Sequence, residues 1–261
     1  MQISLTAIAV CEPADGAINF ARDDVLLDHA RATGSVVLRL YTWDRPVVSF
    51  GRNERVVGRY SPGRIATAGL DVARRRTGGR ALLHHRELTY AVAGPVSAAD
   101  TLHATYAAIN ALLANALRRL GLAVEVAAGK LPALAEGAPC FAAPSRGELV
   151  IGGRKLVASA QWREVGAFVQ HGSMLVDDDQ PLLARALADG VRLPPTPQPA
   201  TLRALLGRAP SLDELAAALV ASATTLTGVV PERVPFEELL PASAVAQHAA
   251  HYRDPAWTWR R

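Results

Sequence analysis

The sequence contains few cysteines, few lysines and no long hydrophobic run. Its 261 residues include two cysteines and two lysines beside 26 arginines. Two cysteines as far apart as Cys11 and Cys140 make neither a disulfide framework nor a zinc knuckle, and they favour a reducing setting. No stretch approaches the roughly 18 consecutive apolar residues of a membrane helix, and the N-terminus lacks the features of a signal peptide. We therefore expect a cytoplasmic protein without a membrane segment.

Signatures of common cofactor and metal sites are also missing. We find no Walker motif, no G-x-G-x-x-G fingerprint, no G-x-S-x-G elbow and no zinc-ligand spacing. His84 and His85 are adjacent but have no partners at metal-ligand spacing. We therefore expect neither a cofactor nor a metal ion.

The charge is positive and is carried almost wholly by arginine. A formal net charge of +4 at pH 7 suits acidic partners, although a composition bias toward arginine also explains it. The run Arg74–Arg76 lacks interleaved aromatic residues, and side chains in a strand alternate between two faces. We expect acidic protein partners and no nucleic acid.

Two segments have the apolar spacing of helices. Residues 16–33 predict an amphipathic helix that ends at Gly34. Its apolar face would carry Phe20, Val25, Leu26, Leu27 and Ala30. Residues 101–120 predict the clearest helix, capped by Asp100 or Thr101 and ended by Gly121. Its inward residues would be Tyr106, Ile109, Leu112, Leu113 and Leu117.

Short strands joined by turns occupy much of the remaining chain. The clearest hairpin joins residues 148–151 to residues 154–161, because Gly152-Gly153 supplies the positive φ angles of a two-residue turn. The segment 166–176 would pair with it as the next antiparallel strand. Other strands are predicted at 35–43, 47–53 and around 124–126.

Beyond Asp177 the pattern becomes helical, at residues 181–190, 201–207 and 211–228, with a proline-rich linker at 193–200. The predicted fold is α+β, with a mixed, largely antiparallel sheet flanked by helices. We expect one catalytic domain over residues 1–261, in which 178–261 form a mostly helical C-terminal part.

Cys140 lies in the loop "APCFAAPS", residues 138–145. A lone cysteine is most often a small buried hydrophobe, and we assign that role to Cys11. A loop of small residues between Pro139 and Phe141 is also a suitable place for a nucleophile. Reactivity requires a thiolate, which a neighbouring cation would favour. The residues alone leave both roles of Cys140 open.

Lys155 begins the second strand of the hairpin. An exposed charge at a strand end is its ordinary interpretation. Because arginine is the usual cation of this chain, a retained lysine also suggests a compact point charge held against a carbonyl oxygen, a carboxylate or a phosphate. Lys130 lies in a loop without any other signal, and we expect it to be solvated.

The segment "RRRTGGRALLHH", residues 74–85, is the second candidate site. Adjacent glycines let backbone N–H groups approach an oxygen-rich ligand closely, although a plain turn has the same pattern.

In their order along the chain, these motifs resemble the lipoate–protein ligase A and octanoyltransferase superfamily. "RRRTGGRALLHHRELTYAV" is similar to its first signature, and "GGRKLVASAQ" followed by "VQHGSMLV" to its second. The resemblance implies the fold of the biotin and lipoate ligase catalytic domain. "CFAAPS", Arg80 and "HRELTYAV" look most like the cysteine-dependent octanoyltransferases, which take octanoate from acyl carrier protein through an enzyme thioester.

This resemblance implies an octanoyltransferase that acts on a lysine of a lipoyl-domain protein, such as a glycine cleavage H protein or a 2-oxoacid dehydrogenase E2. Cys140 would be the nucleophile and Lys155 the essential lysine. The residues that match the substrate-binding motifs are Arg75, Thr77, Gly78, Gly79, Ala81, His84, Ser159, Ala160, Gln161 and His171.

The sequence departs from the family at two places. Ala158 stands where a glycine is usual, and Gly147-Glu148-Leu149 where Tyr-Glu-Leu is common. Ala158 puts the acyl chain length in question. Two alternatives stay open: a ligase that uses ATP and Mg²⁺ or a lipoyl amidotransferase, and a non-catalytic acyl-binding homologue.

Overall fold

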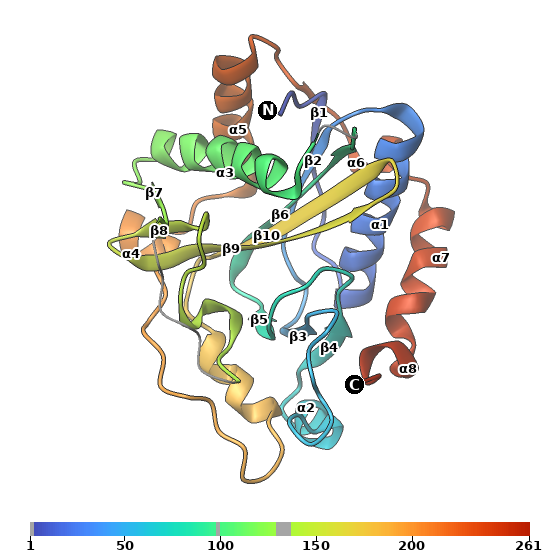
Figure 1. The fold of residues 1–261 in the computed structure, drawn as a ribbon, viewed down its shortest axis with the longest axis vertical. Coiled ribbons are helices and arrows are strands. Elements are labelled where there is room, and N and C mark those ends of the chain that lie inside the picture. The colour runs from blue at the N-terminus through green and yellow to red at the C-terminus, as the bar shows by residue number, and fades with distance from the viewer. Residues whose placement is uncertain (1–2, 98–99, 129–136) are drawn as a thin grey trace.

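The computed structural model describes residues 3–97, 100–128 and 137–261, so that Lys130 lies outside the described residues. These residues form an eight-stranded sheet with a smaller three-stranded sheet below it (Figure 1). The large sheet has the strand order β11-β1-β2-β6-β10-β9-β8-β7. Its strands are β1 (Ala7–Val10), β2 (Val37–Tyr41), β6 (Glu87–Pro95), β7 (Glu125–Val126), β8 (Leu149–Ile151), β9 (Arg154–Glu164), β10 (Ala167–Leu175) and β11 (Glu232–Arg233).

The pairing in both sheets is mixed. In the large sheet β1 pairs in parallel with β2 and β11, and the other neighbours are antiparallel. The small sheet has the order β4-β3-β5 and consists of β3 (Val47–Phe50), β4 (Asp71–Arg74) and β5 (Leu82–His84). The predicted fold class, α+β with a largely antiparallel sheet, is confirmed.

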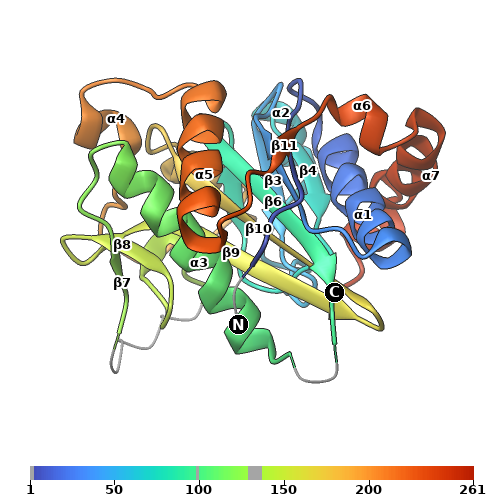
Figure 2. The ribbon, with the colours of Figure 1, turned by 90° about the horizontal axis from the view of Figure 1, so that it is seen from above.

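Helices cover both faces of the large sheet (Figure 2). The α-helices are α1 (Gly16–Thr33), α2 (Pro62–Thr67), α3 (Leu102–Arg119), α4 (Leu202–Leu206), α5 (Leu212–Thr227), α6 (Phe236–Leu239), α7 (Ala242–Arg253) and α8 (Pro255–Thr258). Two 3₁₀ segments are η1 (Cys140–Ala142) and η2 (Gln180–Ala186). None of the described helices is long and apolar enough to span a bilayer.

The helix α1 has the predicted bounds but not the predicted amphipathic character. Asp15 caps its start, and Gly34 at φ +73° ends it. However, α1 lies between the large sheet and α7, and Figure 2 shows this arrangement. Its buried residues therefore include Asp23 and Asp24 beside the apolar ones. A helix covered on two sides does not need a single apolar stripe.

The helices α3 and α5 pack on the opposite face and enclose a second core with β2, β6 and β9. Thr101 is the cap of α3, whereas Asp100 accepts hydrogen bonds from Ser97. The helix ends at Arg119, before the predicted Gly121. Tyr106 is only half-buried and lines a cavity instead of the core.

The predicted hairpin is present, since Gly152 and Gly153 have φ angles of +54° and +71° between β8 and β9. The predicted helix at 181–190 is wrong: η2 is a 3₁₀ segment that ends at Ala186. Its buried residues Leu183 and Ala186 are three positions apart, which matches the 3₁₀ repeat. After η2 the backbone carries no helix until Leu202.

Gly172→Ala should destabilise the large sheet. A Cβ at this position would lie 2.5 Å from the Tyr90 ring and 2.7 Å from the carbonyl oxygen of Ala158. We expect the free energy of unfolding to fall by about 1–3 kcal/mol, as for overpacked cores. Urea unfolding measures the change. Gly63→Ala in α2 is the control, since its new methyl group meets nothing closer than 3.9 Å. Equal stability of the two variants would contradict this prediction.

Candidate active site

Cys140 begins the 3₁₀ segment η1 and is half-buried. Its backbone N–H donates to the carbonyl of Ala81 at 2.9 Å, which joins the cysteine loop to the segment after Gly78 and Gly79. Phe141 and Ala142 are buried. The thiol is therefore held in a fixed loop at the wall of a cavity of about 480 Å³.

Lys155 brings its ammonium group to this loop. The Nζ atom donates to the carbonyl oxygen of Cys140 at 2.8 Å and lies 3.9 Å from Sγ. The side chain is only 3% exposed, so the interpretation as a solvated strand-end charge is wrong. The structure therefore brings the Lys155 ammonium from the hairpin to the Cys140 loop.

The sequence interpretation missed Glu148 as a site residue. Its Oε1 lies 2.8 Å from Lys155 Nζ, and its Oε2 accepts the N–H of Ser145 at 2.6 Å. Burial raises the pKa of Glu148, and the Lys155 ammonium opposes that rise. A signal was available, because Glu148 directly precedes the strand that pairs with the start of β9.

Eight of the ten predicted substrate-binding residues line the cavity. They are Arg75, Gly78, Gly79, His84, Ser159, Ala160, Gln161 and His171. Leu82 also lines it, as do apolar and aromatic side chains that were not predicted, namely Phe20, Tyr41, Leu102 and Tyr106.

Thr77 and Ala81 are buried and are not among the residues that line the cavity, so their expected direct role in shaping it is corrected. The Thr77 hydroxyl faces His171, and the Ala81 methyl packs with Val48 and Phe50 in the core of the small sheet. Both residues support the wall from behind.

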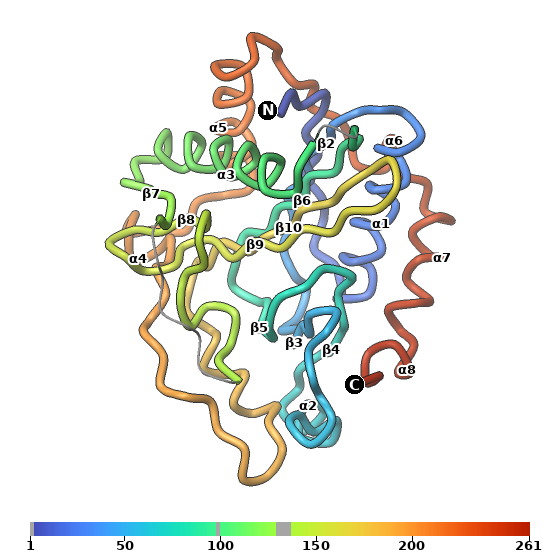
Figure 3. The backbone as a smooth tube through the Cα atoms, in the orientation of Figure 1, coloured from blue at the N-terminus to red at the C-terminus, as the bar shows by residue number. Residues whose placement is uncertain are grey.

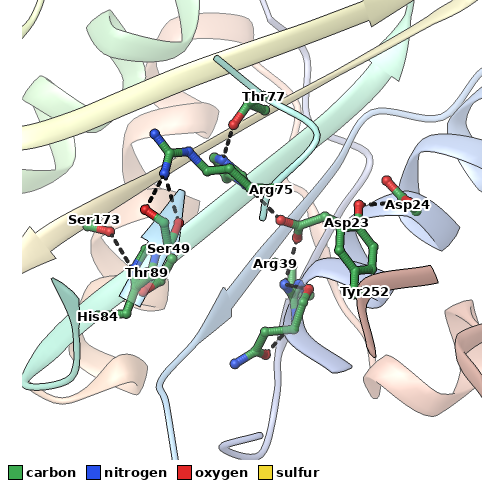
Figure 4. A network of polar contacts seen from close by, with 12 residues as sticks. Asp23, Asp24, Arg39, Ser49, Arg75, Thr77, His84, Thr89, Ser173 and Tyr252 are labelled. Carbon is green, nitrogen blue, oxygen red and sulfur yellow. Dashed lines mark hydrogen bonds and ion pairs between the residues drawn. The ribbon is translucent and has the colours of Figure 1, made fainter. Parts of the chain in front are cut away.

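The buried guanidinium of Arg75 fixes the Gly78-Gly79 turn. It donates to the carbonyls of Gly78 and Arg80, and to the carbonyl and hydroxyl of Ser49. Figure 4 shows Arg75 beside Ser49 in this position. Because N–H and C=O point in opposite directions in a trans peptide, the Gly79 N–H points away from Arg75. Burial lowers the pKa of Arg75, and the charge of Cys140 acts against this effect.

Two glycines, Gly79 in this turn and Gly51 packed against it, are sterically required. A Cβ at Gly79, which has φ +91°, would lie 2.8 Å from the Arg75 guanidinium. A Cβ at Gly51 would lie 1.9 Å from the carbonyl oxygen of Gly79. The backbone therefore reaches the cavity wall only without side chains at these positions.

His171 belongs to a buried chain of polar groups. Its Nε2 lies 2.7 Å from the Thr77 hydroxyl, and its Nδ1 lies 2.9 Å from Asp23, which also binds Arg39 at 2.6 Å. Figure 4 shows Asp23 between Arg39 and the Thr77 side. The Asp23 carboxylate only accepts, so Nδ1 of His171 carries a proton and Nε2 is left for the threonine hydroxyl. This chain ties the glycine turn to α1 and the large sheet.

His84 lies at another part of the cavity wall. Its Nδ1 is 2.7 Å from Glu87, and its ring stacks on Trp43 with the centroids 4.0 Å apart. Burial lowers the pKa of His84. Ser173 contacts both His84 and Glu87 (Figure 4). Burial thus favours the neutral form of His84 in this packed wall, against the opposing effect of Glu87.

Other candidate residues from the sequence have structural surroundings. His85 faces Asp179, and Cys11 is buried, as predicted. The three arginines of the basic run diverge: Arg74 binds backbone carbonyls near Thr258, Arg75 the glycine turn, and Arg76 the Asp24 carboxylate. Across residues 3–97, 100–128 and 137–261, no three His, Cys, Asp or Glu side chains form a group that could hold a metal ion.

The two departures from the family have different surroundings. Ala158 lines the cavity and forms an apolar cluster with Phe141 and Leu175, against which Cys140 packs. Gly147 adopts φ +88°, and its carbonyl accepts the Asn110 amide at 2.7 Å. The methyl group of Ala158 is therefore near the thiol end of the cavity.

Curated relatives are enzymes named octanoyltransferase LipM. That of Carboxydothermus hydrogenoformans is 39% identical over 176 residues, which are 66% of this chain and 65% of that protein. That of Kyrpidia tusciae is 33% identical over 263 residues, which cover 94% of this chain and 95% of that protein. The matched segment thus spans just under two thirds of the first relative and nearly all of the second.

Solved structures share the fold at low sequence identity. The bi-partite lipoate protein ligase from Thermoplasma acidophilum gives a TM-score of 0.72 at 20% identity, covering 98% of this chain and 97% of that chain. A lipoate-protein ligase A bound with ATP gives 0.75 at 21% identity, with 98% of both chains covered. A family model, lipoyl protein ligase A/B catalytic domain, matches residues 15–224. Together with the Kyrpidia relative, this match shows that the chain belongs to the lipoyl protein ligase A/B catalytic domain family.

Proposed function

We propose that the protein is an octanoyltransferase that works through a thioester on Cys140. The observation that carries this proposal is the Cys140 thiol 3.9 Å from a buried lysine ammonium, at the wall of a cavity lined in part by Phe20, Tyr41 and Leu82. The relatives named octanoyltransferase LipM support it. The donor would be octanoyl-acyl carrier protein and the acceptor a lysine of a lipoyl-domain protein.

In the first half-reaction the Cys140 thiolate attacks the carbonyl carbon of the octanoyl thioester. The new C–S bond forms on Cys140, the donor C–S bond breaks, and the carrier leaves as a thiolate that takes up a proton. Lys155 stabilises the attacking thiolate. Gly79 lines the same cavity, and we assign its backbone N–H to the developing oxyanion. One thioester replaces another, so this step needs no ATP.

In the second half-reaction the acceptor amine attacks octanoyl-Cys140 and forms an amide. The amide is more stable than the thioester, and this difference drives the transfer. Each buried methylene contributes about 0.8 kcal/mol, so an eight-carbon chain binds in the cavity several kcal/mol better than a short one.

We also propose that the chain works as one catalytic domain in the cytoplasm. The packing of the C-terminal helices supports a single domain, since α5 packs on α3 and the large sheet, and α7 packs on α1. The net positive charge would favour docking of acidic partner proteins, an effect that salt weakens.

The protein incubated with octanoyl-acyl carrier protein, without ATP, should gain one octanoyl group by intact mass spectrometry. Cys140→Ala should abolish the adduct, and Cys11→Ala should keep it, since Cys11 is buried away from the cavity. An adduct that persists in Cys140→Ala would refute the thioester route. Lipoylation of an acceptor that requires ATP, without any adduct, would identify a ligase instead.

Lys155→Gln should slow octanoylation of Cys140 by about 10²–10³-fold, as when one stabilising donor is removed from an active site. It should also slow alkylation of Cys140 by iodoacetamide at pH 7, because the ammonium no longer stabilises the attacking sulfur. Peptide mass spectrometry separates Cys140 from Cys11. The control is Lys130→Gln, at the other lysine of the chain.

Lys155→Gln leaves the buried Glu148 carboxylate unpaired, which is destabilising. The double variant Lys155→Gln/Glu148→Gln removes both charges, so that no unpaired carboxylate is left buried. The same two rates are measured in this variant. Unchanged alkylation and octanoylation in both variants would exclude a role for the ammonium.

Ala158→Val should slow octanoylation about tenfold, and by a similar factor for hexanoyl, octanoyl and decanoyl donors. Extra methyl groups would crowd the cluster beside Cys140, with an overpacking cost of about 1–3 kcal/mol. Single-turnover rates with the three donors measure the effect. A loss that grows with chain length would instead place Ala158 beside the acyl tail.

A further inference from the structure

The second half-reaction needs a proton acceptor that the pair of Cys140 and Lys155 does not supply. An acceptor lysine arrives as an ammonium, because the unperturbed lysine pKa is about 10.4. Its nitrogen must lose a proton before it can attack the thioester. Lys155 is itself held as a donor by Glu148 and by the Cys140 carbonyl, both at 2.8 Å. It is therefore unsuited to accept that proton.

The histidines of the cavity are also poor candidates. His171 has both ring nitrogens engaged, by Asp23 and by Thr77. His84 binds Glu87 and is packed face to face against Trp43. The exposed His103 lies on the first turn of α3, where no contact fixes its ring among those described. None of the three is held close to the reacting carbonyl by contacts with Cys140 or Lys155.

Glu148 is the one carboxylate among the described residues that line the cavity. Lys155 Nζ contacts both Glu148 Oε1 and the Cys140 carbonyl oxygen. The Lys155 ammonium is therefore the group that joins the carboxylate to the residue that would carry the thioester. Its two oxygens accept one donor each in the contacts described, and a carboxylate has about four lone-pair sites. It can therefore receive a further N–H from an amine that enters the cavity.

The groups around Glu148 bear on its strength as a base. Lys155 on β9 pairs with it, and Tyr106 on α3 and Tyr90 on β6 lie close enough to feel its charge. Burial raises the pKa of Tyr106 to about 12 and also raises that of Tyr90, so both phenols stay neutral. Burial likewise raises the pKa of Glu148. A carboxylate with a raised pKa is a stronger base than an exposed one.

We propose that Glu148 accepts a proton from the acceptor lysine and so prepares it to attack octanoyl-Cys140. This inference rests on the proposed function. The ammonium N–H bond breaks, and the proton passes to Glu148. The nitrogen lone pair then forms the C–N bond, and the C–S bond breaks with its electron pair on Cys140 Sγ, beside Lys155. The second proton of the nitrogen passes to water, and Glu148 later returns its own proton to water.

Glu148→Gln separates the two half-reactions. The amide oxygen of glutamine can still accept a hydrogen bond from Lys155, but it cannot take up a proton. We expect the octanoyl-Cys140 adduct still to form, but more slowly, because Lys155 loses its carboxylate partner. Transfer to a lipoyl-domain acceptor should fall by about 10²–10⁴-fold, the usual contribution of a general base. Intact mass against time follows both steps, and Glu125→Gln, an exposed strand glutamate, is the control.

The pH dependence of transfer distinguishes a base from a structural residue. In Glu148→Gln the transfer rate should rise steadily with pH, because hydroxide and water then deprotonate the amine. In the unmodified protein the transfer rate should fall as pH decreases through the raised pKa of Glu148. The acylation rate should fall less steeply over the same pH change. This second measurement uses the unmodified protein and holds even where the variant folds poorly.

Parallel loss of both half-reactions in Glu148→Gln, without recovery at high pH, would overturn the proposal and leave Glu148 as a residue that positions Lys155. Normal transfer in the variant would also overturn it. Absence of any adduct on the unmodified protein would instead refute the proposed thioester route, and the inference with it.

Discussion

The arrangement around Cys140 depends on one buried ammonium. An ammonium removed from water is costly unless a carboxylate and further acceptors surround it. Lys155 meets this condition with Glu148 on one side and the Cys140 carbonyl on the other. The backbone of Lys155 is fixed as well, because its carbonyl accepts the N–H of Ala200. The cysteine loop, the hairpin and the segment before α4 therefore meet at a single charged group.

A second set of buried charges holds the opposite wall. Arg75 satisfies the carbonyls of the glycine turn, and the chain from Arg39 through Asp23 and His171 reaches Thr77 in the same turn. The Cys140 N–H bond to Ala81 then links this wall to the cysteine loop. Two cations, Arg75 and Lys155, thus act near the thiol, and Glu148 is the acid described beside it. Such a balance suits a thiolate and a developing oxyanion.

Much of the fold was predictable from sequence, and so was the approach of Lys155 to Cys140. The hairpin at Gly152-Gly153 was predictable because a two-residue turn needs positive φ angles that glycine adopts freely. The character of α1 and the 3₁₀ segment η2 were not, because both depend on packing partners distant in sequence. Glu148 was missed because the charge it neutralises meets it only when the hairpin is closed. The sequence motif suggested that Thr77 and Ala81 line the cavity, whereas both side chains are buried behind its wall. Their burial also depends on partners distant in sequence.

The sequence by itself determined the order of the motifs, the turns and the pairing of neighbouring strands, because these depend on local backbone preferences and on side-chain periodicity. It also identified Cys140 and Lys155 as chemically unusual residues in this chain. Only the tertiary structure decided that a carboxylate stands between the lysine and the Ser145 loop, and which residues line the cavity rather than support it. Burial and charge pairing are properties of the assembled core, and no single segment contains both partners.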